Sequence, residues 1–269
     1  MQIADSVKRN EKGGAGVDME QKISGIKMIF QAAGTDKLPE LIEAYSADTR
    51  SGVQALVKSA QKRLENLEKE KARIEGMKEF EYRYREYSYI CGIDEVGRGP
   101  LAGPVVAGAV ILPVDCDILY LNDSKQLSEK KREELYDIIM EKAVATGIGY
   151  ASPERIDGIN ILQATYEAMR QAIGQLRVRP DLLLNDAVTI PEVTIRQIPI
   201  IKGDARSVSI AAASIIAKVT RDRLMVKYDE IFPGYGFASN KGYGAKAHLE
   251  ALRKYGPTVI HRHSFLKKI

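Results

Sequence analysis

Residues 87–112 read YSYICGIDEVGRGPLAGPVVAGAVIL, with two apolar runs on either side of a polar, glycine-rich centre. The runs at residues 89–93 and 105–112 are rich in β-branched side chains and bounded by Gly and Pro, which predicts two strands joined by a tight connection. Asp94 and Glu95 follow the first run directly. Adjacent carboxylates at the end of a buried strand are costly unless they bind a cation or a partner, so the pair predicts a metal site. A solvated loop with a chance acidic pair is the alternative.

The composition is that of an ordinary globular protein. At 269 residues, with 45% hydrophobic and 28% charged residues, the chain is long enough for a full-sized core and an appendage. It has no run of about 18 apolar residues, and residues 1–10 lack the apolar segment of a secretory signal. Cys91 and Cys116 have neither metal-ligand spacing nor the density of a disulfide framework. We therefore expect a cytoplasmic protein in which both cysteines are small buried hydrophobes.

Charge is distributed unevenly along the sequence. Residues 202–269 contain 13 Lys/Arg and 5 Asp/Glu, whereas the rest of the chain has a small acidic excess. A basic segment facing a carboxylate cluster is typical of a metal-dependent enzyme that acts on a polyanion. A basic face that only aids solubility is the alternative.

Residues 1–86 have a helical pattern and no catalytic constellation, which predicts a small helical appendage to a domain at residues 87–269. A largely apolar stretch at 23–33 and a segment at 38–45 that opens on Leu-Pro predict short helices, and apolar residues at three- and four-residue spacing from Ser51 predict a long amphipathic one. The dense charge on that long helix leads to the hypothesis that it increases the hold on a nucleic-acid duplex. Docking on the other domain is the alternative.

Known nucleotide-binding loops do not fit the glycine-rich centre. Gly97, Gly99 and Gly103 have the spacing G-x-G-x-x-x-G, with a proline inside, instead of the G-x-G-x-x-G that opens a helix in dinucleotide-binding proteins. Gly92 to Gly97 followed by Arg98 lacks the Lys-Ser/Thr of a P-loop. Both readings are therefore weak.

The later segments repeat the arrangement of a strand followed by an acidic residue. We expect strands at 147–151, 181–186 and 197–201, with amphipathic helices at 129–145 and 160–176 and a small-residue helix after Asp204. Asp186 ends its apolar strand as Asp94 does, whereas Asp204 at a helix start also fits a simple cap. Lys125 lies near Ser128, a good N-cap.

Several blocks in this order closely resemble the signature of the ribonuclease HII family, the type 2 ribonucleases H. The matching blocks read GIDEVGRGPLAGP at 92–104, DSKQLS at 123–128, KGDARSVSIAAASIIAKVTRD at 202–222, KGYGAKAH at 241–248 and HRHSF at 261–265. Asn185, Ala245 and His263 depart from the residues more usual in the family. The resemblance covers roughly residues 88–266.

This resemblance implies an α/β fold: a ribonuclease H-like mixed β-sheet flanked by helices, here with a small helical N-terminal appendage. It implies that four carboxylates are catalytic and bind metal, namely Asp94, Glu95, Asp186 and Asp204. It also implies that Gly97, Arg98 and Gly99 recognise the 2′-hydroxyl, that Tyr243 stacks on the adjacent sugar, and that Lys125 neutralises a phosphate. For Lys125, a salt bridge to Asp123 or Glu129 is the alternative.

The chemistry of the four carboxylates suits Mg²⁺ or Mn²⁺, whereas zinc would more often recruit His or Cys. Two such ions about 4 Å apart activate a water and stabilise the leaving oxygen in phosphodiester hydrolysis. The resemblance narrows this to cleavage of the RNA strand in RNA–DNA hybrids and 5′ of ribonucleotides embedded in duplex DNA. The sequence has no firm sign of an oligomer, so we expect a monomer. A ribonuclease HIII-like nuclease is less favoured because that family has Gly-Thr-Gly-Asp in place of Gly-Arg-Gly-Pro. A catalytically silent hybrid-binding protein is the alternative from a different class.

Overall fold

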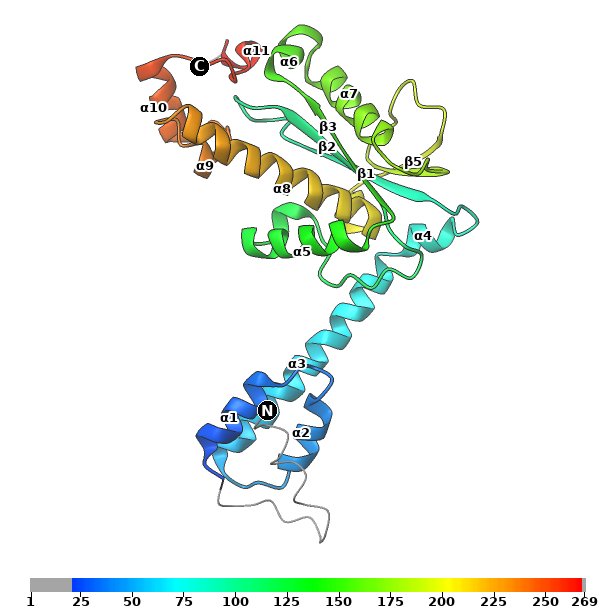
Figure 1. The fold of residues 1–269 in the computed structure, drawn as a ribbon, viewed down its shortest axis with the longest axis vertical. Coiled ribbons are helices and arrows are strands. Elements are labelled where there is room, and N and C mark those ends of the chain that lie inside the picture. Colours follow the sequence, from blue (N-terminus) through cyan, green and yellow to red (C-terminus); the bar gives the residue numbers. More distant parts are fainter. Residues whose placement is uncertain (1–20, 268–269) are drawn as a thin grey trace. The chain divides into compact units, whose positions relative to one another are not determined.

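The computed structural model describes residues 21–267, so the segment 1–10 considered for a signal peptide lies outside the described residues. The chain divides into two compact units, one up to Ala72 and one from Arg73 to Ile269. Figure 1 shows the helices of the first unit and the sheet and helices of the second. The long helix α3 (Ser51–Gly76) contains the boundary between them.

The first unit consists of α1 (Ile23–Ala32), α2 (Leu38–Tyr45) and the N-terminal part of α3, which confirms the three helices expected there. One apolar residue per turn or more points into a small shared core, made by Ile26, Phe30, Leu38, Val53, Val57 and Ala60. Before α3, the Asp48 carboxylate accepts the N–H of Arg50 at 2.9 Å. This unit thus has a core of its own.

The second unit is built on one mixed sheet of five strands in the order β3-β2-β1-β4-β5. The strands are β1 (Ile90–Val96), β2 (Val105–Ile111), β3 (Ala145–Ala151), β4 (Leu182–Asp186) and β5 (Arg196–Ile200). The helices of this unit are α4 (Glu79–Arg83), α5 (Glu129–Lys142), α6 (Pro153–Ile159), α7 (Ile161–Gly174), α8 (Val208–Ile231), α9 (Phe237–Asn240), α10 (Lys246–Tyr255) and α11 (His263–Leu266), with short 3₁₀ turns η1 (Ser124–Gln126) and η2 (Gly203–Ala205). β1 pairs antiparallel with β2 and parallel with β4. The expected mixed sheet flanked by helices is confirmed.

Helices cover both faces of the sheet. Figure 1 shows α8 and α5 on one face and α7 with α6 on the other. The first face buries a core that includes Leu135, Ile139 and Ile215, and the second buries one that includes Ile93, Ala168 and Met169. A strand that is buried on both faces reads as a continuous apolar run, which explains why residues 105–112 show no alternation.

Glycines in β1 and β2 let α8 lie close against the sheet. A Cβ on Gly92 would lie 2.0 Å from the carbonyl carbon of Ser209, and one on Gly108 would lie 2.4 Å from the carbonyl oxygen of Ala213. Because alternate residues of a strand share a face, Asp94 lies on the same face of β1 as Gly92. The side chain of Asp94 is therefore directed toward α8.

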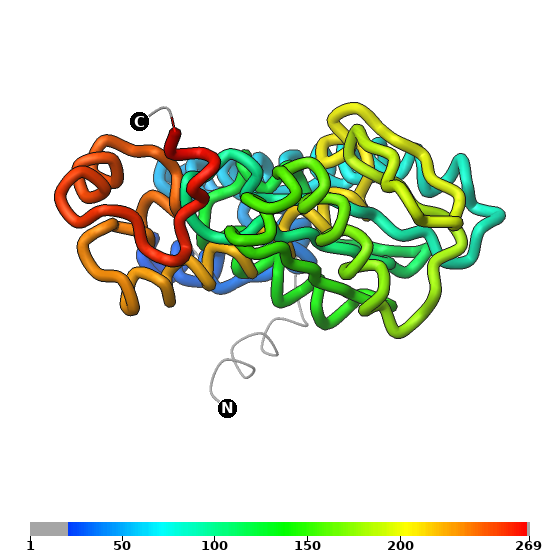
Figure 2. The backbone as a smooth tube through the Cα atoms, turned by 90° about the horizontal axis from the view of Figure 1, so that it is seen from above, coloured from blue at the N-terminus to red at the C-terminus, as the bar shows by residue number. Residues whose placement is uncertain are grey.

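Side chains from distant segments secure the C-terminal part of the domain. The side chain of Asn160 accepts the N–H groups of Leu162 and Gln163 at the start of α7. The Asp157 carboxylate accepts the N–H of His263 at 2.7 Å. Both residues therefore have structural roles. Figure 2 shows the chain after about residue 230, in orange to red, at one end of this domain, and the loop between β4 and β5 at the other. Within residues 21–267, no helix is both long and apolar enough to cross a membrane.

Candidate active site

Strand register brings two of the predicted carboxylates together. β1 and β4 are parallel with Ile93 opposite Asn185, so Asp94 and Asp186 follow at adjacent positions. The Asp186 carboxylate accepts the N–H of Gly203 at 2.7 Å, which places η2 against the end of β4. Asp204 lies on this 3₁₀ turn, before α8, and the residue that caps α8 is Ser207 and not Asp204.

Burial and mutual repulsion destabilise the charged forms of these acids. Asp94 is only 5% exposed, and burial together with the charges of Glu95 and Asp186 raises its pKa well above the ordinary value. Burial also raises the pKa of Glu95, against the lowering effect of Arg98, whose guanidinium lies 3.3 Å from the Glu95 carboxylate. The pKa of Asp204 is raised by burial and by nearby acids. A cluster of this kind favours protons or a cation.

Lys125 lies on η1, close enough to the acids for their charges to act on it. Burial alone would lower the pKa of Lys125, but Asp123, Asp94, Asp204 and Asp186 raise it above the ordinary value. The Asp123 carboxylate accepts the backbone N–H of Lys125 at 2.9 Å and caps η1. In the described part of the chain, the Lys125 ammonium forms no ion pair with Asp123 or Glu129, so it remains available to a substrate.

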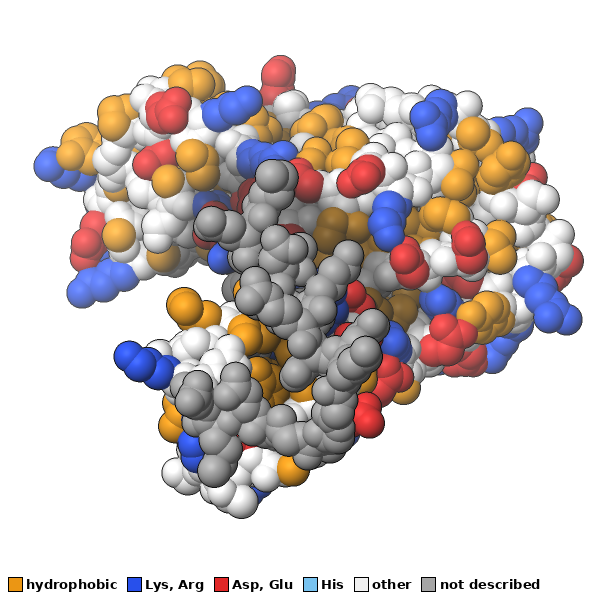
Figure 3. All heavy atoms as spheres, turned by 60° about the horizontal axis from the view of Figure 1, so that its bottom comes forward, with side chains coloured by type: hydrophobic (Ala, Val, Ile, Leu, Met, Phe, Trp, Pro, Cys, Tyr) orange, Lys and Arg blue, Asp and Glu red, His pale blue; other side chains and the backbone are white. Residues whose placement is uncertain are grey.

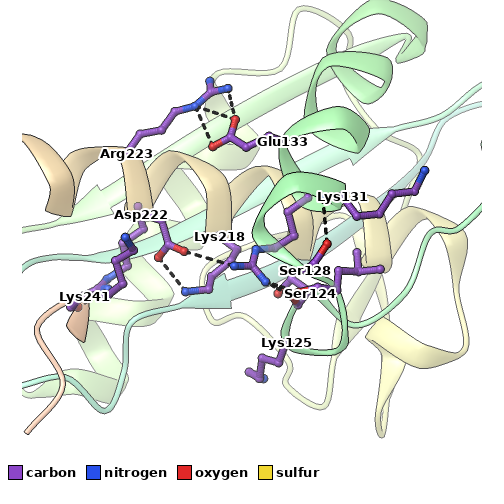
Figure 4. Close-up of polar contacts among 12 residues, drawn as sticks. Ser124, Lys125, Ser128, Lys131, Glu133, Lys218, Asp222, Arg223 and Lys241 are labelled. Atoms are coloured by element: carbon purple, nitrogen blue, oxygen red, sulfur yellow. Dashed lines mark hydrogen bonds and ion pairs between the residues drawn. The ribbon is translucent and has the colours of Figure 1, made fainter. Parts of the chain in front are cut away.

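Polar contacts from α8 and α5 hold η1 in place. The hydroxyls of Ser214 on α8 and Ser124 on η1 lie 3.0 Å apart, and Ser214 also donates to Asp94, which lowers the pKa of that acid. Arg132 on α5 donates to the carbonyl of Ser124 at 3.0 Å. Figure 4 shows Lys218 and Asp222 on α8 pointing toward each other, at 2.7 Å, whereas Lys125 extends away from them. Helices α5 and α8 therefore position the segment that carries Lys125.

The glycine-rich segment between β1 and β2, residues 97–104, forms a loop beside the carboxylates, which we call the 97–104 loop. Gly97 and Gly103 have φ values of +90° and +85°, which favour glycine. Tyr243 is 44% exposed, and its ring carbon Cε1 would lie 3.7 Å from a Cβ on Gly99. The structure thus places one of the three predicted ribose-contacting residues, Gly99, next to Tyr243, whereas Arg98 pairs with Glu95.

Two buried arginines beneath this loop were not singled out from the sequence. Arg221 on α8 and Arg262 before α11 are both 0% exposed, and their guanidinium groups donate to backbone carbonyls of the loop. A helical arginine four residues from each of the apolar neighbours Ala217 and Met225 was the one signal available. Arginine is otherwise almost never fully buried, so the sequence favoured a surface position.

The histidines near Tyr243 are structural. Nδ1 of His248 lies 2.8 Å from the carbonyl of Tyr243, and its Nε2 lies 3.0 Å from Nε2 of His261. Because Nδ1 of His248 must carry the proton to reach a carbonyl, His261 must donate from its Nε2, and both rings are neutral. Burial and the neighbouring ring lower the pKa of His261 to about 4, which agrees with this assignment.

As the side chains stand, no three or more His, Cys, Asp or Glu residues among those described already form a metal-ligand arrangement. The donor set of Asp94, Glu95, Asp186 and Asp204 is nevertheless made of oxygen atoms alone, which is the chemistry that Mg²⁺ and Mn²⁺ prefer. Burial and mutual repulsion raise the carboxyl pKa values, and the positive charges of Arg98 and Lys125 offset this only in part. The residues therefore fit a hard divalent cation.

Comparison with known proteins agrees with this site. The sequence profile described as ribonuclease HII matches residues 91–268, and the profile of the ribonuclease HII N-terminal domain matches residues 22–85. The ribonuclease HII of Lachnoclostridium phytofermentans is 63% identical over 251 residues, which is 93% of this chain and 99% of that protein. The ribonuclease HII of Clostridioides difficile is 52% identical over 252 residues, again 93% and 99% of the two chains.

A solved structure shares the fold. The ribonuclease H2 of Pyrococcus horikoshii superposes with a TM-score of 0.56 at 29% identity, covering 66% of this chain and 94% of that one. The family profile covers more than half of the chain, and the bacterial relatives match almost its full length. The chain therefore belongs to the ribonuclease HII family and is a ribonuclease H enzyme.

Proposed function

We propose that this ribonuclease H cleaves the RNA strand of RNA–DNA hybrids and also cuts on the 5′ side of ribonucleotides embedded in duplex DNA, with two divalent cations. One observation carries the proposal: the carboxylate cluster lies directly beside a loop with free backbone donors and an exposed tyrosine. The first feature suits phosphodiester hydrolysis and the second suits recognition of a ribose. Together they link the cut to a particular sugar.

Asp94, Glu95, Asp186 and Asp204 would hold the cations. When bound, Mg²⁺ or Mn²⁺ supplies an activated water and stabilises the leaving oxygen. The chain provides the positions of the four acids on β1, β4 and η2, and it provides Lys125, whose raised pKa keeps the ammonium protonated at neutral pH. That ammonium would neutralise a substrate phosphate beside the cluster.

Ribose recognition would use the backbone of the 97–104 loop. The N–H groups of Arg98 and Gly99 donate to no other residue within 21–267, so both donors are open to a ligand. The 2′-hydroxyl distinguishes ribose from deoxyribose and both accepts and donates hydrogen bonds. Tyr243 lies beside Gly99 and would stack on the adjacent sugar.

The test is cleavage of a labelled DNA duplex that contains one ribonucleotide, with Mg²⁺ or Mn²⁺, by the intact protein and by Asp94→Asn. We expect a single cut 5′ of the ribonucleotide that leaves a 3′-hydroxyl and a 5′-phosphate, is lost in the variant, and is absent on all-DNA duplex. Cutting only within runs of several ribonucleotides would contradict the assigned role of residues 97–99. Binding of the hybrid with no cleavage at any metal concentration would indicate a silent hybrid-binding protein.

The cellular setting is part of the same proposal. We propose a monomer that acts in the cytoplasm. The two cysteines are free and buried, which fits a reducing compartment. Sedimentation of the intact protein across a range of concentrations tests the monomer, and a concentration-dependent dimer would contradict it.

A further inference from the structure

The 97–104 loop is built around the guanidinium group of Arg262. Its nitrogens donate to the carbonyls of Gly97 at 2.6 Å, Arg98 at 2.9 Å and Gly103 at 2.7 and 2.9 Å. One side chain therefore joins the beginning of the loop to its end. Arginine presents five donors in a rigid fork, which suits it to hold several carbonyls in one fixed arrangement.

This arrangement determines where the backbone donors of the loop point. All described peptide bonds are trans, and in a trans peptide the C=O and N–H groups point in opposite directions. With the carbonyls of Gly97 and Arg98 directed at Arg262, the N–H groups of Arg98 and Gly99 are directed away from it. Neither of these N–H groups donates a hydrogen bond to any residue within 21–267.

Arg221 joins the same loop to the segment that carries Tyr243. Its guanidinium donates to the carbonyls of Pro104 at 2.9 Å, Ala102 at 3.0 Å and Lys241 at 2.9 Å. The carbonyl of Gly242 also accepts the N–H of Leu101 at 2.8 Å. The buried guanidinium of Arg221 therefore fixes the spacing between the 97–104 loop and the segment that carries Tyr243.

We propose that Arg221 and Arg262 are positioning residues for ribose selection, which hold the donors of Arg98 and Gly99 and the ring of Tyr243 in register with one sugar. The inference rests on the proposed function. It explains why two arginine side chains are buried here although, among the described residues, neither has a carboxylate within ion-pair distance. A buried charge is costly unless it is fully hydrogen-bonded, and the loop carbonyls supply those bonds.

Burial lowers the pKa of Arg221 to about 10 and that of Arg262 to about 9, so both remain protonated at neutral pH. Their charge therefore also lies behind a surface that faces a polyanion. This contribution is not specific for ribose, because phosphates occur in both strands. Selection and general affinity can accordingly be separated by experiment.

The test uses the full chain with Asp94→Asn to prevent cleavage, and measures the Kd for a duplex with one ribonucleotide and for the same all-DNA duplex. Arg221→Lys and Arg262→Lys keep the charge but replace the rigid fork, which donates from three nitrogens, by a single nitrogen on a flexible stem. The measured quantity is the ratio of the Kd for the all-DNA duplex to the Kd for the duplex with one ribonucleotide. We expect each variant to reduce this ratio at least about tenfold, since ribose contacts would be misaligned. If the arginines have a purely structural role, the variants should have a lower unfolding temperature and bind both duplexes more weakly to the same extent, so that the Kd ratio is unchanged.

Two further variants make the outcome decisive. Arg177→Lys changes an arginine that donates to the carbonyl of Val144 at 2.6 Å, away from the 97–104 loop and from Tyr243. The Kd ratio of this variant should stay at the wild-type value. Gly242→Ala leaves both buried charges in place but puts a Cβ 2.4 Å from the carbonyl of Ala102, at a φ of +85°. It should reduce the ratio as the arginine variants do, and it replaces them should they not fold.

The outcomes separate the two proposals. If the Asp94→Asn protein with both arginines intact binds the two duplexes equally, the proposed ribose recognition itself is wrong. If that protein discriminates and the lysine variants and Gly242→Ala keep the full ratio, the positioning role is wrong. In a Tyr243→Ala background, Arg221→Lys should have a smaller effect on the ratio, because the contact that it aligns has been removed.

Discussion

The carboxylate cluster and the 97–104 loop both contain buried charge, but only the loop has partners for all of it. In the cluster, burial and mutual repulsion raise the pKa values of Asp94 and Asp204. In the loop, Arg221 and Arg262 donate to backbone carbonyls at 2.6–3.0 Å. The uncompensated region is suited to gaining a ligand, whereas the compensated one is suited to keeping a shape.

The difference follows from what each region has to recognise. A cation can be held by side chains that repel one another in its absence, because the ion supplies the missing charge. A 2′-hydroxyl is neutral, so it can be selected only by donors and acceptors that already stand at the right positions. The buried charge of Arg221 and Arg262 is therefore hydrogen-bonded to backbone carbonyls, whereas the N–H groups of Arg98 and Gly99 stay open for a ligand.

The largest effect that tests this contrast is expected at Asp94. Asp94→Asn should reduce cleavage by at least about 1,000-fold, because a ligand to the cations is lost. The same substitution removes repulsion within the cluster, so the unfolding temperature of the metal-free protein should stay constant or rise. A marked fall in that temperature would show that Asp94 is a structural residue and that the cluster is not uncompensated.

A smaller effect is expected at Gly97, on the loop side of the comparison. Gly97→Ala would put a Cβ 2.2 Å from Nε of Arg221 at a φ of +90°, which should reduce the free energy of unfolding by about 1–3 kcal/mol. Gly99→Ala is the matched control, because its Cβ would meet only the Tyr243 ring at 3.7 Å and the φ of Gly99 is not positive. Chemical denaturation measures both. Equal losses at the two positions would mean that the loop is not held tightly by Arg221.

How far the sequence predicted these two regions differs in the same way. The strands were located to within a few residues, because apolar runs bounded by Gly and Pro mark them. Asp94 and Glu95 lie within the last part of β1 instead of after it, because β1 continues to Val96. Asp204 follows no strand, and only the family resemblance indicated its role. The arginine contacts could not be predicted, because Arg262 binds Gly97, which is 165 residues away in the chain. Charge at a strand end has a local signature, whereas the support of a loop by distant side chains has none.

The appendage gives a second example. The sequence predicted the long helix from Ser51, and α3 confirms it. It did not predict that the apolar residues of this helix serve two cores, since Val57 packs in the first unit whereas Ile74 packs with Leu121 in the second. A continuous amphipathic stripe specifies a helix but not which core each turn joins.

A still smaller effect concerns pH and the metal-free protein. The pKa values of Asp94, Glu95 and Asp204 are raised in the folded state, so the folded protein binds more protons than the unfolded chain above the ordinary carboxyl pKa of about 4. Stability from these groups is therefore present at low pH and is lost as the pH rises toward the raised values. Relative to Asp94→Asn, wild type should lose unfolding temperature as the pH rises, by about 2–4 °C for each kcal/mol. Because both proteins contain His261, its titration cancels in the difference. A constant difference from pH 4.5 to 8 would contradict the repulsion described for the cluster.

The smallest effect is expected in the appendage, where charge lies on the surface. Figure 3 shows basic and acidic side chains interspersed on the face that it displays, and exposed charges of this kind act mainly through general attraction to phosphates. Lys58 and Lys62 are exposed and form no ion pair with any residue that the structure describes. Replacing both by Ala should therefore raise KM for a hybrid by about 2- to 5-fold at low salt and have little effect at high salt.

Lys69→Ala is the matched control on the same helix, because the Lys69 ammonium already lies 2.5 Å from the carboxylate of Glu65. An exposed ion pair of this kind contributes little to stability, so its loss should alter neither folding nor, by more than a small factor, the KM. If the double variant keeps the wild-type KM at every salt concentration, the long helix does not hold the duplex. The appendage then contributes nothing to substrate affinity through these lysines, and ribose selection depends on the second unit alone.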